Sequence, residues 1–222
     1  MEWIPLYVNM EGLRVAVLGG GTVAERRALT FSAAGAFVDV YSLDFTPGLR
    51  EASLKGNLRL HRVDLRGVEP DSILRGYSLV VIATSDPGLN EVFLEEARRM
   101  GLLVNYPPDG TRGSVIVPFR GEASYGLRVA VTSLGETGVA ARAALERIVG
   151  CLEEDRYLRG LYSVMSRVKR YMKESIGDYK LRYRLYFKIA GDPLFGELVG
   201  KGLLEEAYQR AVDIIRGETG SR

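Results

Sequence analysis

Short runs of apolar residues recur along the first half of the chain and are separated by segments typical of helices. Five runs have the length of strands; the third alternates apolar and polar residues, and the others are largely apolar. They cover residues 14–18, 36–41, 58–63, 78–83 and 102–105. Helices are expected over residues 25–34 and 90–100. This alternation predicts an α/β fold with a parallel sheet.

The pattern changes near residue 114. Two more strands are expected over residues 114–118 and 127–131, followed by a helix over 138–149. Beyond Gly150, the composition predicts helices that are interrupted near Gly177, Gly191 and Gly200. The expected parts are an α/β domain over residues 1–112, a small strand-rich connector over 113–150 and an all-helical carboxyl-terminal domain over 151–222.

A glycine-rich motif connects the first strand to the first helix. Its sequence, Gly19-Gly20-Gly21-Thr22-Val23-Ala24, has the pattern G-x-G-x-x-A. In this context Gly19 permits a tight turn, Gly21 leaves room for a pyrophosphate, and Ala24 allows close helix–strand packing. The helix N-terminus directs free N–H groups at the phosphates. The motif predicts a Rossmann-like dinucleotide site with residues 19–23 against the pyrophosphate; a glycine-rich turn in a non-binding α/β fold is the alternative.

The ends of the second and fourth strands supply the other candidate cofactor residues. Leu43 and Asp44 follow the second strand, where a Rossmann domain meets the adenosine ribose. No Arg follows at once to hold a 2′-phosphate, which favours NAD over NADP. Asp44 could equally be a turn residue before Thr46. Thr84 and Ser85 end the fourth strand, where the bound dinucleotide should lie.

Composition limits the classes of protein and of site. The chain has 222 residues, of which 46% are hydrophobic and 26% charged, as in an ordinary globular protein. No apolar run has the roughly 18 residues of a membrane span, and no secretory signal opens the chain, so we expect a cytoplasmic protein without membrane contact. A single cysteine, Cys151, and a single histidine, His61, exclude a disulfide framework and a zinc site of the usual ligand count. No metal ligand is predicted, and His61, inside a strand pattern, is expected to be structural.

The positive charge is concentrated in one segment. Residues 156–188 contain ten Lys or Arg and two acids, a balance of +8, which leaves −6 for the rest of the chain. Clustered cations indicate a polyanionic partner, although a solvated helix face is the alternative. Six tyrosines lie in the segment and suit either a flat ligand or the helical core. No recognised nucleic-acid motif accompanies them, so nucleic acid is the less favoured partner.

Several motifs occur in an order typical of one family. They are Ile-Pro-Leu-Tyr at residues 4–7, the glycine motif within 17–26, Ala-Thr-Ser-Asp at 83–86 with Asn90, Val-Asn at 104–105, Val-Pro at 117–118, and Thr-Ser-Leu-Gly-Glu-Thr at 132–137 with Ala-Arg at 141–142. In this order the chain resembles the bifunctional precorrin-2 dehydrogenase and sirohydrochlorin ferrochelatase family, the amino-terminal module of siroheme synthases.

The resemblance implies an activity and partners. It implies NAD-dependent removal of two hydrogens from precorrin-2 to give sirohydrochlorin, with ferrous iron as the substrate of a second, chelatase activity. It also implies a homodimer formed through residues 113–150 and a substrate-binding role for residues 151–222. The carboxylates of a tetrapyrrole suit the basic segment, in which Arg167 and Arg170 are candidate ligands. Ser133 aligns with a serine that is phosphorylated in some members and is a further substrate-site candidate, with a turn-forming role as the alternative.

The sequence departs from the family at the catalytic aspartate. That aspartate aligns with Pro108, and Asp109 is the next residue. Asp109 is the predicted general base, because a small change in the loop would bring its carboxylate to the same place. The alternative is a non-catalytic protein that binds NAD or a tetrapyrrole and has lost the base.

Overall fold

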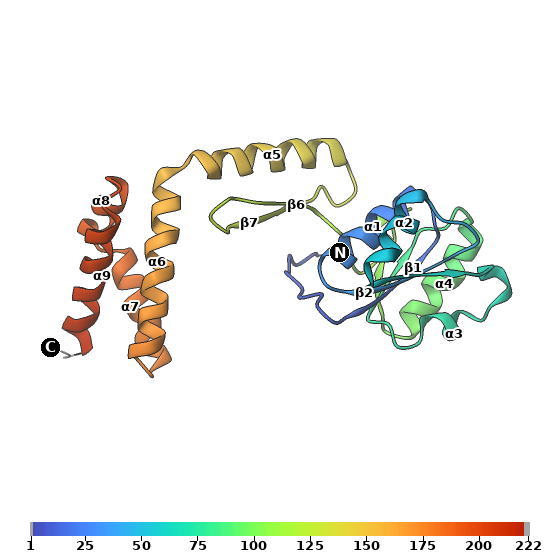
Figure 1. Cartoon of the computed structure of the whole chain (residues 1–222), viewed down its shortest axis with the longest axis horizontal. Helices are drawn as coiled ribbons and strands as arrows, with labels where there is room; N and C mark the ends of the chain where they lie inside the picture. The colour runs from blue at the N-terminus through green and yellow to red at the C-terminus, as the bar shows by residue number, and fades with distance from the viewer. Residues whose placement is uncertain (1, 220–222) are drawn as a thin grey trace. The chain divides into compact units, whose positions relative to one another are not determined.

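The computed structural model describes residues 2–219 (Figure 1). The chain up to Val117, together with Ser133–Thr137, forms one compact unit. Pro118–Thr132 and the chain from Gly138 onward form the second. Each unit is built around its own hydrophobic core.

The first unit contains a five-stranded parallel sheet. Its strands are β1 (Arg14–Leu18), β2 (Phe37–Ser42), β3 (Leu58–Arg62), β4 (Leu79–Ile82) and β5 (Leu103–Asn105), and they lie in the order β3-β2-β1-β4-β5. Val17 on β1 lies beside Val40 on β2 and Val81 on β4. The strand order reverses beside β1, so the chain crosses to the other half of the sheet after β3. The predicted α/β fold with a Rossmann-like parallel sheet is confirmed.

Helices cover both faces of this sheet, which explains why β4 is apolar throughout and β1 is apolar after Arg14. They are α1 (Thr22–Ala33), α2 (Pro47–Ala52), α3 (Pro70–Leu74) and α4 (Pro87–Arg99), with short 3₁₀ turns η1 (Ser53–Lys55), η2 (Leu65–Gly67) and η3 (Gly110–Arg112). Phe31 of α1 belongs to the core on one face, and Phe93 of α4 belongs to the core on the other. The sheet is therefore the middle layer of three.

Two helices begin earlier than expected. Helix α1 starts at Thr22, directly after Gly21, instead of at residue 25. Helix α4 starts at Pro87 instead of Asn90, because the Asp86 carboxylate accepts a hydrogen bond from the Leu89 N–H at 3.1 Å. Asp at the N-cap and Pro at the first helical position favour this earlier start.

The strand expected over residues 114–118 is wrong. The N–H groups of Ser114 and Val115 both donate to the carbonyl of Val104, at 2.8 and 2.9 Å, so the segment follows β5 without forming a ladder. Pro118 has no N–H to donate, and the strand begins directly after it. This strand, β6 (Phe119–Glu122), pairs antiparallel with β7 (Arg128–Val131).

The rest of the second unit is helical, as predicted. Its helices are α5 (Gly138–Glu154), α6 (Arg156–Ser175), α7 (Tyr179–Ala190), α8 (Pro193–Gly200) and α9 (Leu204–Thr219). Asp155, Asp178 and Asp192 cap the N-termini of α6, α7 and α8 by accepting backbone N–H groups at 2.8–2.9 Å. The predicted breaks near Gly177, Gly191 and Gly200 coincide with the ends of α6, α7 and α8. The dimerisation role of residues 113–150 stays a prediction.

A cluster of hydrogen-bonded polar side chains is centred on Asp39 of β2. Asp39 of β2 is 8% exposed and accepts hydrogen bonds from the Tyr77 hydroxyl at 2.9 Å and His61 Nε2 at 2.6 Å. Arg14 lies 3.7 Å from the same carboxylate and over the Tyr77 ring. Burial by itself would raise the pKa of Asp39, but the hydrogen bonds from His61 and Tyr77 outweigh it and hold the pKa below its ordinary value. His61 thus has the structural environment expected for it.

We expect Asp39→Asn to lower the free energy of unfolding by about 1–3 kcal/mol at neutral pH, because it weakens a buried, multiply bonded acceptor. The folded-state pKa lies below the unfolded value of about 3.9, so the stabilisation is complete above that value and is lost as the pH falls through the folded pKa. Urea unfolding followed by circular dichroism should therefore show a difference in free energy of unfolding between parent and variant that is smaller below pH 4 than at pH 7. Asp71→Asn, at a more exposed helical ion pair, is the control. An equal difference in free energy of unfolding at both pH values would contradict stabilisation by the ionised Asp39 carboxylate.

Candidate functional site

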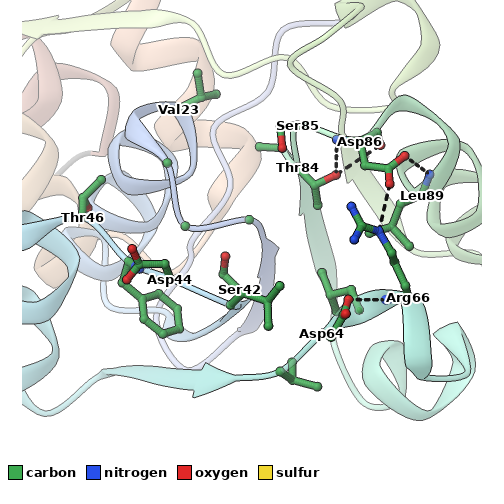
Figure 2. A pocket seen from close by; sticks show the side chains of 18 of the residues that line it. Val23, Ser42, Asp44, Thr46, Asp64, Arg66, Thr84, Ser85, Asp86 and Leu89 are labelled. Atoms are coloured by element: carbon green, nitrogen blue, oxygen red, sulfur yellow. Dashed lines mark hydrogen bonds and ion pairs between the residues drawn. The ribbon is translucent and has the colours of Figure 1, made fainter.

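A pocket of about 650 Å³ lies at the carboxyl ends of the first four strands. It is lined by residues 19–23 after β1, 42–46 at the end of β2, 63–66 after β3, and 83–86 with Leu89 after β4. Figure 2 shows side chains from these segments around one opening. All the candidate cofactor residues, Gly19, Gly20, Gly21, Thr22, Val23, Leu43, Asp44, Thr84 and Ser85, line this pocket.

Two glycines permit the turn between β1 and α1 to lie close to its neighbours. Gly19 has a φ of +111°, and its N–H donates to the Tyr41 carbonyl at 2.9 Å. A Cβ atom on Gly19 would overlap the Ala83 carbonyl, and one on Gly20 would overlap the Asp44 carbonyl. Since both obstacles are backbone, neither can move aside cheaply. The turn therefore joins the ends of β2 and β4 into one pocket wall.

Gly21 has a different environment. A Cβ atom there would meet nothing within 4 Å, and Gly21 lines the pocket. It is the N-cap of α1 and supplies no side-chain hydrogen bond to the first turn. The N–H groups at a helix N-terminus attract anions, because they lack partners within the helix and lie at the positive end of its dipole. These features fit a dinucleotide pyrophosphate, which needs both close backbone approach and N–H donors.

Carboxylates dominate the rest of the pocket wall. Asp44, Asp64 and Asp86 follow β2, β3 and β4, and among the described residues that line the pocket Arg66 is the only cation. Arg66 Nε lies 3.2 Å from the Asp86 carboxylate. The pKa of Asp86 is lowered by the hydrogen bond from the Leu89 N–H and then by Arg66. This wall suits the hydroxyls of a ribose better than an additional phosphate.

Asp44 combines the two roles considered for it. One carboxylate oxygen accepts a hydrogen bond from the Phe45 N–H at 2.8 Å and pairs with Arg50 at 2.5 Å. These contacts make it a turn residue. Its side chain is 86% exposed and belongs to the pocket wall, so it is also accessible to a ligand.

Asn90 holds the loop after β4 in place. It is buried, and its side-chain oxygen accepts a hydrogen bond from the Thr84 hydroxyl at 2.6 Å, while its amide donates to the Thr84 carbonyl at 3.0 Å. The Thr84 hydroxyl is 3.2 Å from the Asp86 N–H. Asn90 thereby positions the loop that contains Thr84 and Asp86 in the pocket wall, without lining the pocket itself.

Sequence reasoning missed several lining residues. They are Ser42, Phe45, Thr46, Val63, Asp64, Leu65, Arg66, Ala83, Asp86 and Leu89. The segment 63–66 follows the third parallel strand, so the rule that ligands bind at carboxyl ends of strands was a usable signal for it. Nothing in the local sequence distinguishes Leu89, which reaches the pocket from the first turn of α4.

Asp109 is not among the residues that line this pocket. It is exposed and caps η3, where one carboxylate oxygen accepts the Thr111 hydroxyl at 2.6 Å and the Thr111 N–H at 3.0 Å. These two hydrogen bonds, the side-chain one first, lower the pKa of Asp109. The carboxylate is therefore ionised at neutral pH and is a weakened base. Its catalytic role stays a prediction.

The three substrate-site candidates lie in different parts of the fold. Ser133 is in the first unit, where its hydroxyl accepts the Thr137 N–H at 2.9 Å next to Leu134, whose φ is +56°. Arg167 on α6 makes two hydrogen bonds to Glu205 on α9, at 2.5 and 3.0 Å, and lies over the Tyr208 ring. Arg170 is exposed on α6. Ser133 forms a turn, and Arg167 joins two helices.

Within residues 2–219 no group of three or more His, Cys, Asp or Glu side chains is placed to hold a metal ion. Over the same residues no helix has the length and apolar character needed to cross a membrane.

Residues 6–119 match a family described as putative NAD(P)-binding. The chain belongs to this family. The match covers the whole pocket, so the predicted dinucleotide-binding domain is confirmed and NAD(P) is its cofactor class.

Several known proteins are similar to this chain over most of its length. The precorrin-2 dehydrogenase of Methanosarcina barkeri is 28% identical over 96% of this chain and 91% of its own length. The siroheme synthases of Psychromonas ingrahamii and Aeromonas salmonicida (siroheme synthase 2) are 30% identical over 93% and 90% of this chain, which spans only 42% and 40% of their lengths. A solved structure named SirC, precorrin-2 dehydrogenase, has a TM-score of 0.68 at 20% identity, covers 95% of this chain and 100% of its own, and supports the fold. The resemblance to precorrin-2 dehydrogenases and siroheme synthases is confirmed.

We expect Gly21→Val to weaken NAD binding by this family member by about tenfold to a hundredfold, because forcing extra atoms into an occupied space costs about 1–3 kcal/mol. The φ of Gly21 is −83°, which valine adopts without strain, so the variant should fold. Titration of NAD by calorimetry measures the loss. Gly217→Val, at an exposed glycine that also has open space around it, is the control. Parental NAD affinity in Gly21→Val would refute the pyrophosphate assignment.

Proposed function

We propose that the protein is an NAD-dependent dehydrogenase that removes two hydrogens from precorrin-2 to give sirohydrochlorin. The observation that carries the proposal is the pocket at the turn between β1 and α1, where Gly21 leaves an open space at a helix N-terminus. The match to a precorrin-2 dehydrogenase over 91% of that relative's length supports the choice of substrate.

The chain's own residues bind and orient the reactants in this proposal. When bound, NAD supplies a hydride acceptor. The first turn of α1 holds the pyrophosphate, and Asp44 accepts hydrogen bonds from ribose hydroxyls. The Thr84–Asn90 hydrogen bonds fix the loop after β4. The substrate also loses a proton, and Asp109, which is ionised at neutral pH, is the proposed acceptor.

NAD is the proposed cofactor in preference to NADP. A 2′-phosphate near Asp44 would bring two further negative charges to a wall that already contains Asp64 and Asp86. Arg50 and Arg66 are paired with Asp44 and Asp86, so neither is a free partner for that phosphate.

Further parts of the proposal concern iron, assembly and location. Ferrous iron is proposed as a second substrate that is inserted into sirohydrochlorin, where it would meet the macrocycle's own nitrogens and nearby carboxylates. A homodimer formed through residues 113–150 and a cytoplasmic location complete the proposal.

A non-catalytic binder is the second candidate. It is favoured by the position of Asp109 outside the pocket wall and by its hydrogen bonds to Thr111, which leave no free carboxylate at the family position occupied by Pro108. Such a protein would bind NAD or a tetrapyrrole without turnover.

Anaerobic incubation with precorrin-2 and NAD should produce the NADH absorbance band together with the spectrum of sirohydrochlorin. NADP should support a slower reaction, because the pocket disfavours its phosphate. Gly21→Val serves as the cofactor-binding control and should lose activity. Retained NAD binding without any NADH production would reject the dehydrogenase in favour of the binder.

Asp109→Ala should lower kcat by about 10²–10⁴, the range for loss of a positioned acid or base, and leave NAD affinity unchanged. Because the hydrogen bonds from Thr111 lower the pKa of Asp109 from its ordinary value, the carboxylate is ionised at neutral pH, and its titration should affect the parental rate only in acid. Steady-state kinetics as a function of pH test both statements, with Asp71→Ala as an exposed control. A parental rate in Asp109→Ala would remove this residue from the mechanism.

A further inference from the structure

Helix α7 buries only one side in the core of the second unit. Leu185 and Ile189 are buried in the core of the second unit, and Leu181 is packed against that core. These positions recur every four residues and lie on one line along the helix. The remaining sides of α7 contribute little to the core.

Aromatic rings occupy the side opposite this buried line. Tyr183 and Phe187 are 67% and 58% exposed, and their ring centroids are 4.9 Å apart. Tyr186 is 37% exposed, and its ring lies 6.0 Å from that of Phe187. Tyr179, one turn earlier, is also exposed. Exposed apolar side chains that cluster in this way mark an interaction site, whereas single scattered ones are normal on a protein surface.

Cations flank the rings, and no acid interrupts them within α7. Its four cations are Lys180, Arg182, Arg184 and Lys188. Arg182 donates to the Ile176 carbonyl, and Lys188 pairs with Glu218 at 2.6 Å. To the residues that the structure describes, Lys180 and Arg184 make no side-chain hydrogen bond or ion pair. Arg184 acts on Glu218 only at longer range.

Elsewhere in the basic segment, part of the positive charge is paired within the fold. Arg167 on α6 is held by Glu205 and the Tyr208 ring, and Arg159 pairs with Glu153. Four other cations of α6, Arg156, Lys169, Arg170 and Lys173, make no side-chain hydrogen bond or ion pair to the described residues. Helix α7 is distinguished by a cluster of exposed, contacting rings beside its two unpaired cations.

We infer that the outer face of α7, defined by Tyr183, Tyr186, Phe187, Lys180 and Arg184, docks an acidic tetrapyrrole. The flat apolar macrocycle packs against the rings, and its carboxylates pair with the two cations. The identity of this ligand rests on the proposed function. The patch is compact, with both tyrosine rings within 6.0 Å of Phe187, and so it matches one macrocycle better than the extended track of a single-stranded nucleic acid.

Binding of a stable octacarboxylate porphyrin, followed by its absorbance and fluorescence, tests the inference on the full chain. The double variants Tyr183→Ala/Phe187→Ala and Lys180→Glu/Arg184→Glu should each weaken binding by about tenfold or more, since truncated anchors cost more than about 1 kcal/mol each. Exposed residues of the first unit provide matched controls, Phe37→Ala for the rings and Lys55→Glu for the charges. Circular dichroism and NAD affinity should be parental in every variant.

The outcomes separate this inference from the proposed function. If the parent oxidises precorrin-2 and both double variants keep parental porphyrin affinity and KM, the docking surface is refuted and the dehydrogenase stands. If the parent forms no NADH but porphyrin binding depends on α7, the dehydrogenase is refuted and the surface stands. Unchanged porphyrin binding together with loss of a salt-sensitive oligonucleotide shift in the double variants would overturn the inference in favour of nucleic acid.

Discussion

The close approach of the turn after β1 to the ends of β2 and β4 is the constraint on which the cofactor pocket depends. At Gly19 and Gly20 the nearest obstacles to a side chain are backbone carbonyls of Ala83 and Asp44. Both carbonyls belong to backbone that follows β2 and β4 and cannot move aside cheaply, so this approach requires residues without a Cβ atom. It also sets the direction in which α1 leaves the turn, and hence the direction of the N–H groups at its first turn. Gly21 is then free to face the ligand.

Several aspartates of the first unit are kept ionised by hydrogen bonds, some in the pocket wall and some away from it. Asp86 starts α4 and also forms the pocket wall, while Asp39 is held by hydrogen bonds on the sheet, away from that wall. In both cases donors stabilise the charged form, and the pKa is lowered. Hydrogen bonds from Thr111 lower the pKa of Asp109 in the same way. A carboxylate with a lowered pKa binds hydrogen-bond donors well but is a weak base, so it accepts a proton readily only from an acidic group of the substrate. The proposed reaction therefore depends strongly on how the cofactor and the substrate are positioned.

The second unit distributes its positive charge unevenly. Asp192 pairs with Arg210 and Glu205 pairs with Arg167, so ion pairs between helices neutralise part of the excess positive charge. Helix α7 receives no such acid except at its end, through Lys188 and Glu218. Its exposed rings and free cations occupy adjacent sides of a single helix. This arrangement follows from a buried line only one residue wide, which leaves the other positions free for recognition.

The amino-acid sequence by itself determined the parallel sheet, the helical second half, the dinucleotide motif and the family, because these depend on local spacing. Apolar runs, glycines at 19–21 and capping aspartates act within a few residues of one another. Tertiary structure decided which distant segments share the pocket, and it brought Arg66 to Asp86 across 20 positions of sequence. It also replaced the strand expected over residues 114–118 by a segment bonded to a single carbonyl, and it placed Arg167 against Glu205, 38 residues away. Such pairings depend on how packed elements meet, and neither spacing nor composition records which partner a long charged side chain will reach.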